Sequence, residues 1–231
     1  MTTRLPLPGS PDIWVELVRH PRAKRLTLRV SQLDGAVRLT LPKRASQAAA
    51  AAFLAEKAHW VRTQLAQFKP PLPVSLGAKL PIDGVLREVV EHEGNSPTRL
   101  GPDTLSLPRR RGALGPRIGA WVKLRARDHL TACCQRHATA IDRRFTQLRL
   151  RDTRSRWGSC TSQGSLMFNW RLVLAPPPVL DYVAAHEVAH LQEMNHSPAF
   201  WAIVARLSPQ YETHQNWLRA HGTSLHRYGF D

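Results

Sequence analysis

The sequence has few of the features that mark several protein classes. Its 231 residues include only three cysteines, two of them adjacent at positions 133 and 134, so we do not expect a disulfide framework. No apolar run approaches the roughly 18 residues that cross a membrane, and the first residues lack the apolar core of a signal peptide. We therefore expect a cytoplasmic protein that does not contact membranes, and we exclude secreted mini-proteins and coiled coils.

Acidic residues are also scarce. The chain has 17 Asp and Glu against 33 Lys and Arg, a formal net charge of +16, and both of its halves are basic. The densest stretches run from Arg19 to Arg44, with eight basic residues and one acidic, and from Arg143 to Arg156, with six and one. Such a balance favours anionic partners such as nucleic acid, nucleotides or acidic surfaces. Arginine that serves solubility and packs its aliphatic stem would give the same composition.

The hydropathy pattern predicts an α+β protein with two domains, 1–112 and 113–231, joined at the basic segment 109–112. The expected elements of the first domain are strands within 13–41, the last two at 26–33 and 37–41 with a hairpin turn at Asp34-Gly35, then a helix over 46–68 capped by Ser46, and short strands within 74–107. Those of the second are a helix over 118–141, a hairpin of strands at 147–150 and 165–174 around the loop 152–160, and helices that begin near Val179, Pro198 and Pro209 and end at Gly222. The first domain is thus β-rich with one long helix.

The segment His186-Glu187-Val188-Ala189-His190 has the spacing of a metal site. Residues four apart share one face of a helix, so both imidazoles can bind one metal ion. Zinc lowers the pKa of a bound water to about 7, and the carboxylate of Glu187 is placed to take the proton as that water attacks. With the 11 histidines of this chain, chance predicts roughly 0.02 such matches. We therefore predict one zinc or similar divalent ion per chain, with Glu187 as the general base.

A catalytic zinc site has three protein ligands and one open position. His196, six residues after His190, is the predicted third ligand, and metzincin proteases use the same spacing with a glycine at the position of Glu193. Here we expect Asn195 to supply the left-handed turn, since Ser197-Pro198 opens a new helix just after it. The sequence leaves three other ligands open, which are Glu193, Glu212 and His214.

Four blocks of the sequence resemble a known family. They are Arg156-Trp157-Gly158-Ser159-Cys160, Phe168-Asn169-Trp170-Arg171-Leu172, the segment from Val183 to His190, and the segment from Asn195 to Trp201. In order and spacing they resemble the YgjP-like metallopeptidase family, a relative of the SprT-like and WLM-type zincins. The resemblance implies a zincin-like catalytic domain with His186, His190 and His196 as ligands and Glu187 as base. The label "peptidase" rests on the zincin motif, so the substrate does not come with the resemblance.

Substrate-binding residues are predicted in the loop 152–160, which contains Gly158, and in the strand that follows it. Arg154, Arg156 and Arg171 cluster around the expected cleft wall, where a guanidinium can grip a phosphate through two hydrogen bonds, and Asn169 completes this set. The alternative for the arginines is a solvated surface position.

The loop itself is expected to be structural. We expect Trp157 and Cys160 to pack and Gly158 to allow a tight bend. In zincins an antiparallel edge strand binds extended substrate through its backbone, a role that either the strand 165–174 or the loop 154–160 could take.

These observations predict metal-dependent hydrolysis by attack of water. A metallopeptidase fits the motif best. A nucleoside triphosphate pyrophosphohydrolase, acting for example on UTP, fits the charge and the arginines at the same metal site. A nucleic-acid-associated protease, which would recruit its substrate through a basic surface, lies between the two. The sequence carries no signal of oligomeric state.

Overall fold

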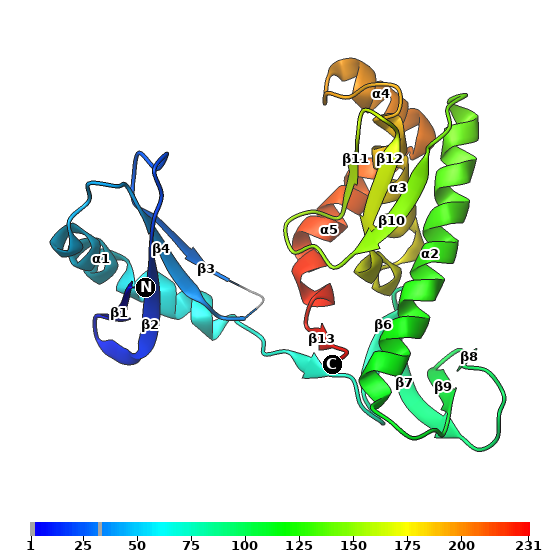
Figure 1. The fold of residues 1–231 in the computed structure, drawn as a ribbon, viewed down its shortest axis with the longest axis horizontal. Coiled ribbons are helices and arrows are strands. Elements are labelled where there is room, and N and C mark those ends of the chain that lie inside the picture. Colours follow the sequence, from blue (N-terminus) through cyan, green and yellow to red (C-terminus); the bar gives the residue numbers. More distant parts are fainter. Residues whose placement is uncertain (1–2, 32–33) are drawn as a thin grey trace. The chain divides into compact units, whose positions relative to one another are not determined.

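A computed structural model describes residues 3–31 and 34–231 of the chain. It confirms the predicted α+β class, since runs of strands, β1–β4 within 3–41 and β5–β9 within 72–108, are followed by helices along the chain (Figure 1). The chain divides into two compact units, Met1–Pro71 and Leu72–Asp231. Residues 32–33, the end of one predicted strand, lie outside the described residues. Within the described part of the chain, no helix is both long and apolar enough to cross a membrane.

Unit 1, Met1–Pro71, is a four-stranded sheet with one helix packed on it. Its strands are β1 (Thr3–Leu7), β2 (Ser10–Arg19), β3 (Thr27–Val30) and β4 (Val37–Leu41), in the order β1-β2-β4-β3. β4 is parallel to β2 and antiparallel to β3, with which it forms the predicted hairpin. Helix α1 (Gln47–Ala66) buries a stripe formed by Ala50, Leu54, Ala58 and Val61. As predicted, the Ser46 hydroxyl caps this helix by accepting a hydrogen bond from the Ala49 amide.

Unit 2, Leu72–Asp231, contains the remaining elements. Its first part consists of β5 (Leu72–Pro73), β6 (Lys79–Ile82), β7 (Val85–His92), β8 (Arg99–Leu100), β9 (Thr104–Pro108) and α2 (Leu114–Ala140). Its second part consists of β10 (Gln147–Arg151), β11 (Gly158–Cys160), β12 (Ser165–Asn169), the 3-10 helix η1 (Trp170–Leu174), α3 (Pro177–Ala189), α4 (Pro198–Leu207), α5 (Tyr211–Leu225) and β13 (Tyr228–Gly229). The sheet orders are β6-β7-β9-β8, β10-β12-β11 and β13-β5. Helix α3 packs against α2, α4, α5 and β11, and it is the central element of this unit.

The boundary between the units differs from the predicted one at 112/113. The strands β6, β7 and β9 contribute Leu80, Val89 and Leu105 to the same core as Ile118 and Val122 of α2. Helix α2 covers the apolar face of these strands, so the strands and the helix share one core. The chain instead divides after α1, between Pro71 and Leu72, and the basic segment 109–112 only joins β9 to α2.

The sheet beside α3 also differs from the predicted hairpin. β10 runs parallel to β12, and the antiparallel partner of β12 is β11, which lies inside the segment predicted as a loop. Residues 170–174 form the 3-10 helix η1 rather than the end of a strand. Its four apolar residues, Trp170, Leu172, Val173 and Leu174, are all buried. With Arg171 as the one polar position, the run is too apolar for its hydropathy pattern to separate a strand from a helix.

The last helix starts and ends later than predicted. Ser208 closes α4 by donating its amide hydrogen to the Val204 carbonyl, so it does not cap the next helix. α5 begins at Tyr211 and continues past Gly222 to Leu225. Gly222 is instead a point of close approach, since a Cβ there would lie 3.0 Å from the Trp157 ring.

Candidate metal centre

Helix α3 holds the residues of the metal motif in a rigid frame. The helix is buried on nearly all sides, including Val183, Ala184 and Val188. It therefore lacks the amphipathic pattern of a surface helix. Near its carboxyl end it presents His186, Glu187 and His190 towards β11 and α4.

The structure brings His196 to this pair of histidines. Ligand nitrogens of His186, His190 and His196 all lie within 4.8 Å of one another, and the Nε2 atoms of His186 and His196 are 3.2 Å apart. Within residues 3–31 and 34–231, the cluster contains no carboxylate. None of the three alternative ligands, Glu193, Glu212 and His214, belongs to this cluster in the described part of the chain.

The chain reverses after His190 without the left-handed residue predicted at Asn195. The non-glycine residues with positive φ in the described chain are Asp83 and Asp142. Instead the helix tightens, with the Leu191 amide donating to the Val188 carbonyl, and the Asn195 side chain accepts a hydrogen bond from the Ser197 amide. Asn195 thus shapes the turn through its side chain.

Phe200 forms the floor of the cluster. It is fully buried on α4, which Ser197 caps as predicted. Its ring stacks on His190 with centroids 4.4 Å apart and meets His186 and His196 edge-on at 4.9 and 4.8 Å. One aromatic side chain therefore fixes the orientation of all three imidazoles.

The histidines suit a divalent metal ion. His190 Nδ1 donates to the Glu193 carbonyl at 3.0 Å, which leaves the lone pair of Nε2 for a metal. His186 Nδ1 is buried and has no hydrogen-bond partner among the described residues. Burial and the neighbouring imidazoles lower the pKa of His186 to about 4, so its ring is neutral at pH 7. Neutral imidazole is the form that binds metals.

Glu187 lies beside the cluster and is only 6% exposed. Burial raises its pKa to about 8, against the opposing effect of the Arg156 charge. The carboxylate rests against the backbone of β11, where a Cβ on Gly158 would lie 2.5 Å from Glu187 Cγ and Oε1. We predicted that Gly158 allows a tight bend. Its role in the structure is different: without a side chain it lets Glu187 lie directly against the strand.

β11 is an edge strand that offers main-chain groups beside Glu187. Within the described chain it pairs only with β12. Asn169 donates its amide hydrogen to the Trp157 carbonyl and Thr161 donates to Ser165, and hydrogen-bonded pairs alternate along an antiparallel ladder. The N–H and C=O groups of Gly158 and Cys160 therefore point to the free edge.

Two pockets flank the centre. One of about 380 Å³ is lined by Arg156, Trp157, Gly158, Tyr182, Val183, His186, Glu187, Gln215, Leu218 and Arg219. The other, of about 330 Å³, is lined by Arg144, Thr161, Ser162, Gln163, Gly164, His190, Leu191, Gln192 and Met194. Gly158, at the start of β11, lines the first pocket, and Thr161, just after its end, lines the second. β11 therefore runs from one pocket to the other.

The predicted substrate-binding residues do not stay together. Arg156 lines the larger pocket. Arg171 is 11% exposed and is held by the Asp152 carboxylate and by the Leu225 and Tyr228 carbonyls.

Two further members of that set are not among the residues that line the larger pocket. The fully buried Asn169 donates from its side chain to the Thr153 carbonyl and accepts from the Arg171 amide. Arg154 lies near enough to His226 to help lower its pKa. Arg171 and Asn169 therefore anchor the segment that leads into β11.

Sequence reasoning missed the contribution of α5. Gln215, Leu218 and Arg219 line the larger pocket, and Gln215 donates a hydrogen bond to the Tyr182 hydroxyl. Their spacing could have revealed this face, because Gln215, Leu218, Arg219 and Gly222 stand at i, i+3, i+4 and i+7 and so share one face of a helix. That face was hidden because it mixes polar and apolar residues.

Comparisons with known proteins identify the family of the chain. A family model described as the YgjP-like metallopeptidase domain matches residues 24–221. No curated protein matches the chain. Among solved structures it is similar to the crystal structure of the metallopeptidase zymogen of Pyrococcus abyssi abylysin, with 16% identity and a TM-score of 0.36 over 40% of this chain and 92% of that one. The chain belongs to the YgjP-like metallopeptidase family and is a metal-dependent hydrolase.

Proposed function

We propose that this protein is a zinc-dependent peptidase that cleaves an extended polypeptide lying along β11. The observation that carries the proposal is the free edge of β11 beside the buried Glu187 and the three imidazoles. A strand edge binds a chain through its peptide groups and tolerates many side chains. Peptides offer such groups, and nucleotides do not.

The proposed roles follow from the positions of the side chains. His186, His190 and His196 would hold the ion, a ligand set that leaves one position open. When bound, zinc supplies Lewis-acid chemistry, which lowers the pKa of water and polarises a carbonyl group. Glu187 would accept the proton of the attacking water on a carboxylate oxygen and pass it to the leaving amine. The two pockets would receive side chains on either side of the cleaved bond.

One observation favours a second candidate. Arg156 and Arg219 both line the pocket that contains Glu187. Two guanidinium groups beside a hydrolytic carboxylate suit phosphate oxygens, since arginine binds them through two hydrogen bonds. The alternative substrate is therefore a nucleoside triphosphate that loses pyrophosphate.

A substrate panel separates the two. The purified protein is incubated with casein, quenched fluorescent peptides and the four nucleoside triphosphates, with zinc or with a chelator. We expect cleavage of casein and peptides that the chelator abolishes. Intact peptides together with release of pyrophosphate would overturn the peptidase and favour the second candidate. Glu187→Gln serves as the control for contaminating hydrolases.

A further inference from the structure

We propose that unit 1 binds an extended acidic polypeptide, which joins the free edge of β3 as an added strand in the groove between β3 and α1. This site is separate from the metal centre and does not depend on the proposed peptidase activity. Its ligand class is an unfolded segment in which apolar and acidic residues alternate.

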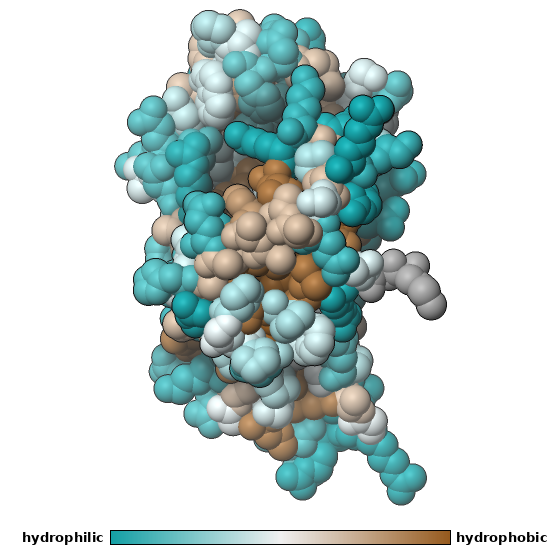
Figure 2. Space-filling view, turned by 90° about the vertical axis from the view of Figure 1, so that its left-hand side faces the viewer, coloured by the Kyte–Doolittle hydropathy of each residue, from teal (hydrophilic) through white to brown (hydrophobic). Residues whose placement is uncertain are grey.

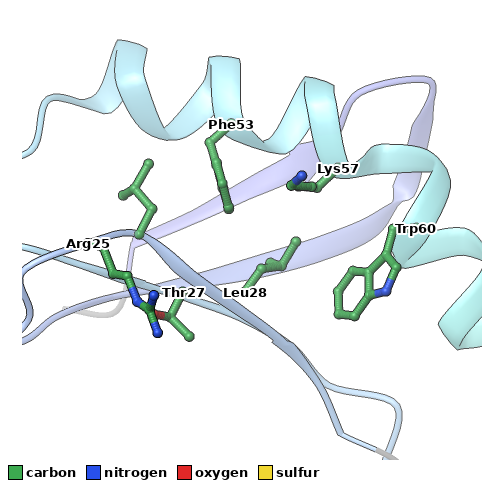
Figure 3. A pocket seen from close by; sticks show the side chains of 7 residues that line it. Arg25, Thr27, Leu28, Phe53, Lys57 and Trp60 are labelled. Atoms are coloured by element: carbon green, nitrogen blue, oxygen red, sulfur yellow. The ribbon is translucent and has the colours of Figure 1, made fainter.

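The groove has a volume of about 420 Å³. Its lining is formed by Arg25, Leu26, Thr27, Leu28, Phe53, Lys57 and Trp60 (Figure 3). Figure 3 shows Phe53 and Trp60 pointing from α1 towards the strand, with Leu28 pointing back to the helix. The face of the molecule drawn in Figure 2 carries apolar groups in its centre with hydrophilic groups around them, and the residues of the groove itself are those drawn in Figure 3. Trp60 remains 41% exposed in this hollow, and a partly exposed tryptophan in a groove is a typical anchor for a partner.

β3 has a free hydrogen-bonding edge along the groove. Within the described chain it pairs only with β4. The Ser31 amide donates to the Ala36 carbonyl at 2.9 Å, and this fixes which pairs of the ladder are hydrogen-bonded. Arg29 and Thr27 bond to β4, so Leu28 and Val30 direct their N–H and C=O groups outward. An incoming strand finds a template there.

Side chains on β3 define the pattern of the ligand. Leu28 and Val30 lie opposite the buried Leu39 and Val37, on the face that α1 covers. Arg29 and Thr27, which also borders the groove, alternate with them and are exposed. An added strand would direct every second side chain towards Phe53 and Trp60 and the others alongside the arginines. Cross-strand neighbours are stabilising when they are apolar pairs or opposite charges. Alternating apolar and acidic residues therefore fit best.

Charge decides between this ligand and two others. A second copy of this chain, paired through β3, would bring Arg25 and Arg29 close to the arginines of the other copy. Such like-charge neighbours destabilise a strand pair. Only two cationic side chains line the groove, Arg25 and Lys57, and Lys57 also pairs with Glu56 at 2.7 Å. A polynucleotide binds through many phosphate contacts, whereas a peptide needs the strand edge and the apolar walls that are present.

The test is fluorescence anisotropy with the full chain carrying Glu187→Gln, which prevents cleavage. The probe is a fluorescein-labelled nine-residue peptide in which Glu alternates with Val and Leu. We expect saturable binding that Trp60→Ala weakens about tenfold or more, and that Arg25→Glu combined with Arg29→Glu weakens by a similar factor. The matched controls are Trp14→Ala, since Trp14 is 55% exposed on β2 and outside the groove, and the exposed Arg44→Glu. Neither control should change binding by more than about twofold.

Two peptide series test the backbone contact. N-methylation at alternate residues removes the amide donors of one strand edge, so one of the two methylated sets should lose binding and the other keep it. Equal binding of both sets, or binding unaffected by Trp60→Ala and by the arginine pair, would overturn the proposal. So would Trp60-dependent binding of a labelled oligothymidylate in place of the peptide. Because the protein used is inactive, these outcomes are independent of the substrate panel.

Discussion

Helix α3 and strand β11 border the same centre and contribute to it differently. α3 supplies side chains from a buried helix: the His186 imidazole and the Glu187 carboxylate, with the His190 imidazole at its C-cap. β11 supplies main-chain groups, and it is held by Asn169 and Arg171, which do not line either pocket of the centre. Under the proposed function, the reacting groups come from one element and the substrate lies along another, which is held in place by residues outside the two pockets. Changes on the two sides should have different consequences, for turnover on one and for stability on the other.

The largest effect is expected from loss of a ligand. His196→Ala should remove most of the bound zinc and with it the activity, since a catalytic site needs its third protein ligand. Metal analysis after gel filtration measures the loss. Glu193→Ala and Glu212→Ala are the matched controls, and each should keep about one ion per chain. Retention of zinc by His196→Ala with loss in either control would move the third ligand to a carboxylate.

Glu187→Gln isolates the chemistry on α3. The amide keeps the shape of the carboxylate but cannot accept a proton, so we expect kcat to fall about 10²- to 10⁴-fold. Zinc content and Tm should stay near those of the wild type. Turnover close to that of the wild type would exclude Glu187 as the base for any substrate.

Gly158→Ala tests the contact between the two elements. The added Cβ would meet Glu187 at 2.5 Å, so either the carboxylate or the strand must move. We expect turnover to fall about 10²-fold, as for a displacement of about 1 Å at a reacting group, and stability to fall by about 1–3 kcal/mol. Ser159→Ala, one position along β11, should leave both unchanged. Steady-state kinetics and urea unfolding provide the two readouts, and a fully active Gly158→Ala would contradict the packing.

The α3 side was predictable from the sequence and the β11 side was not. His186 and His190 form a local pattern, because helical periodicity alone brings them to one face, and Glu187 is recognised because it directly follows the first of them. Asn169 and Arg171 are polar residues in one of the four blocks that resemble the family, so they looked like binding residues. The local sequence does not distinguish a guanidinium that binds a ligand from one that bonds to two carbonyls and a carboxylate of its own chain. The parallel pairing of β10 with β12 depends on contacts between segments that are distant in the sequence. The domain boundary likewise depends on the packing of β6, β7 and β9 against α2, which the local sequence does not show.

Arg171→Ala tests the supporting role. Its guanidinium bonds to Asp152 and to two backbone carbonyls and stacks on Trp170 at 4.5 Å. Truncation should destabilise unit 2 by about 2–3 kcal/mol, with partial rescue by Arg171→Lys, since lysine lacks the planar fork. Arg156→Ala is the matched control, because Arg156 is exposed, and it should stay within about 0.5 kcal/mol of the wild type. Urea unfolding of the three variants measures this; equal stabilities of Arg156→Ala and Arg171→Ala would contradict the assignment.

The smallest effect concerns pH, through His226, whose ring lies 5.2 Å from that of Trp157 on the β11 side. Burial and the Arg171 charge lower the pKa of His226 to about 4, from an ordinary value near 6.5. Between these values the unfolded chain binds a proton that the folded chain does not, so wild-type stability should decline as the pH falls from about 6.5 towards 4.

His226→Gln removes this contribution and should flatten the decline by about 1–2 kcal/mol at pH 4.5, with no difference between the proteins in slope above pH 7. The comparison is made by urea unfolding at a series of pH values. His221→Gln replaces an exposed histidine of α5 and should follow the wild-type curve. Because each variant keeps His186 and His190, their protonation affects all curves alike and cancels in the differences. If stability falls equally with pH in the wild type and in His226→Gln, then His226 binds its proton as readily in the folded chain as in the unfolded one. The β11 side would then tolerate a charge that we expect it to exclude.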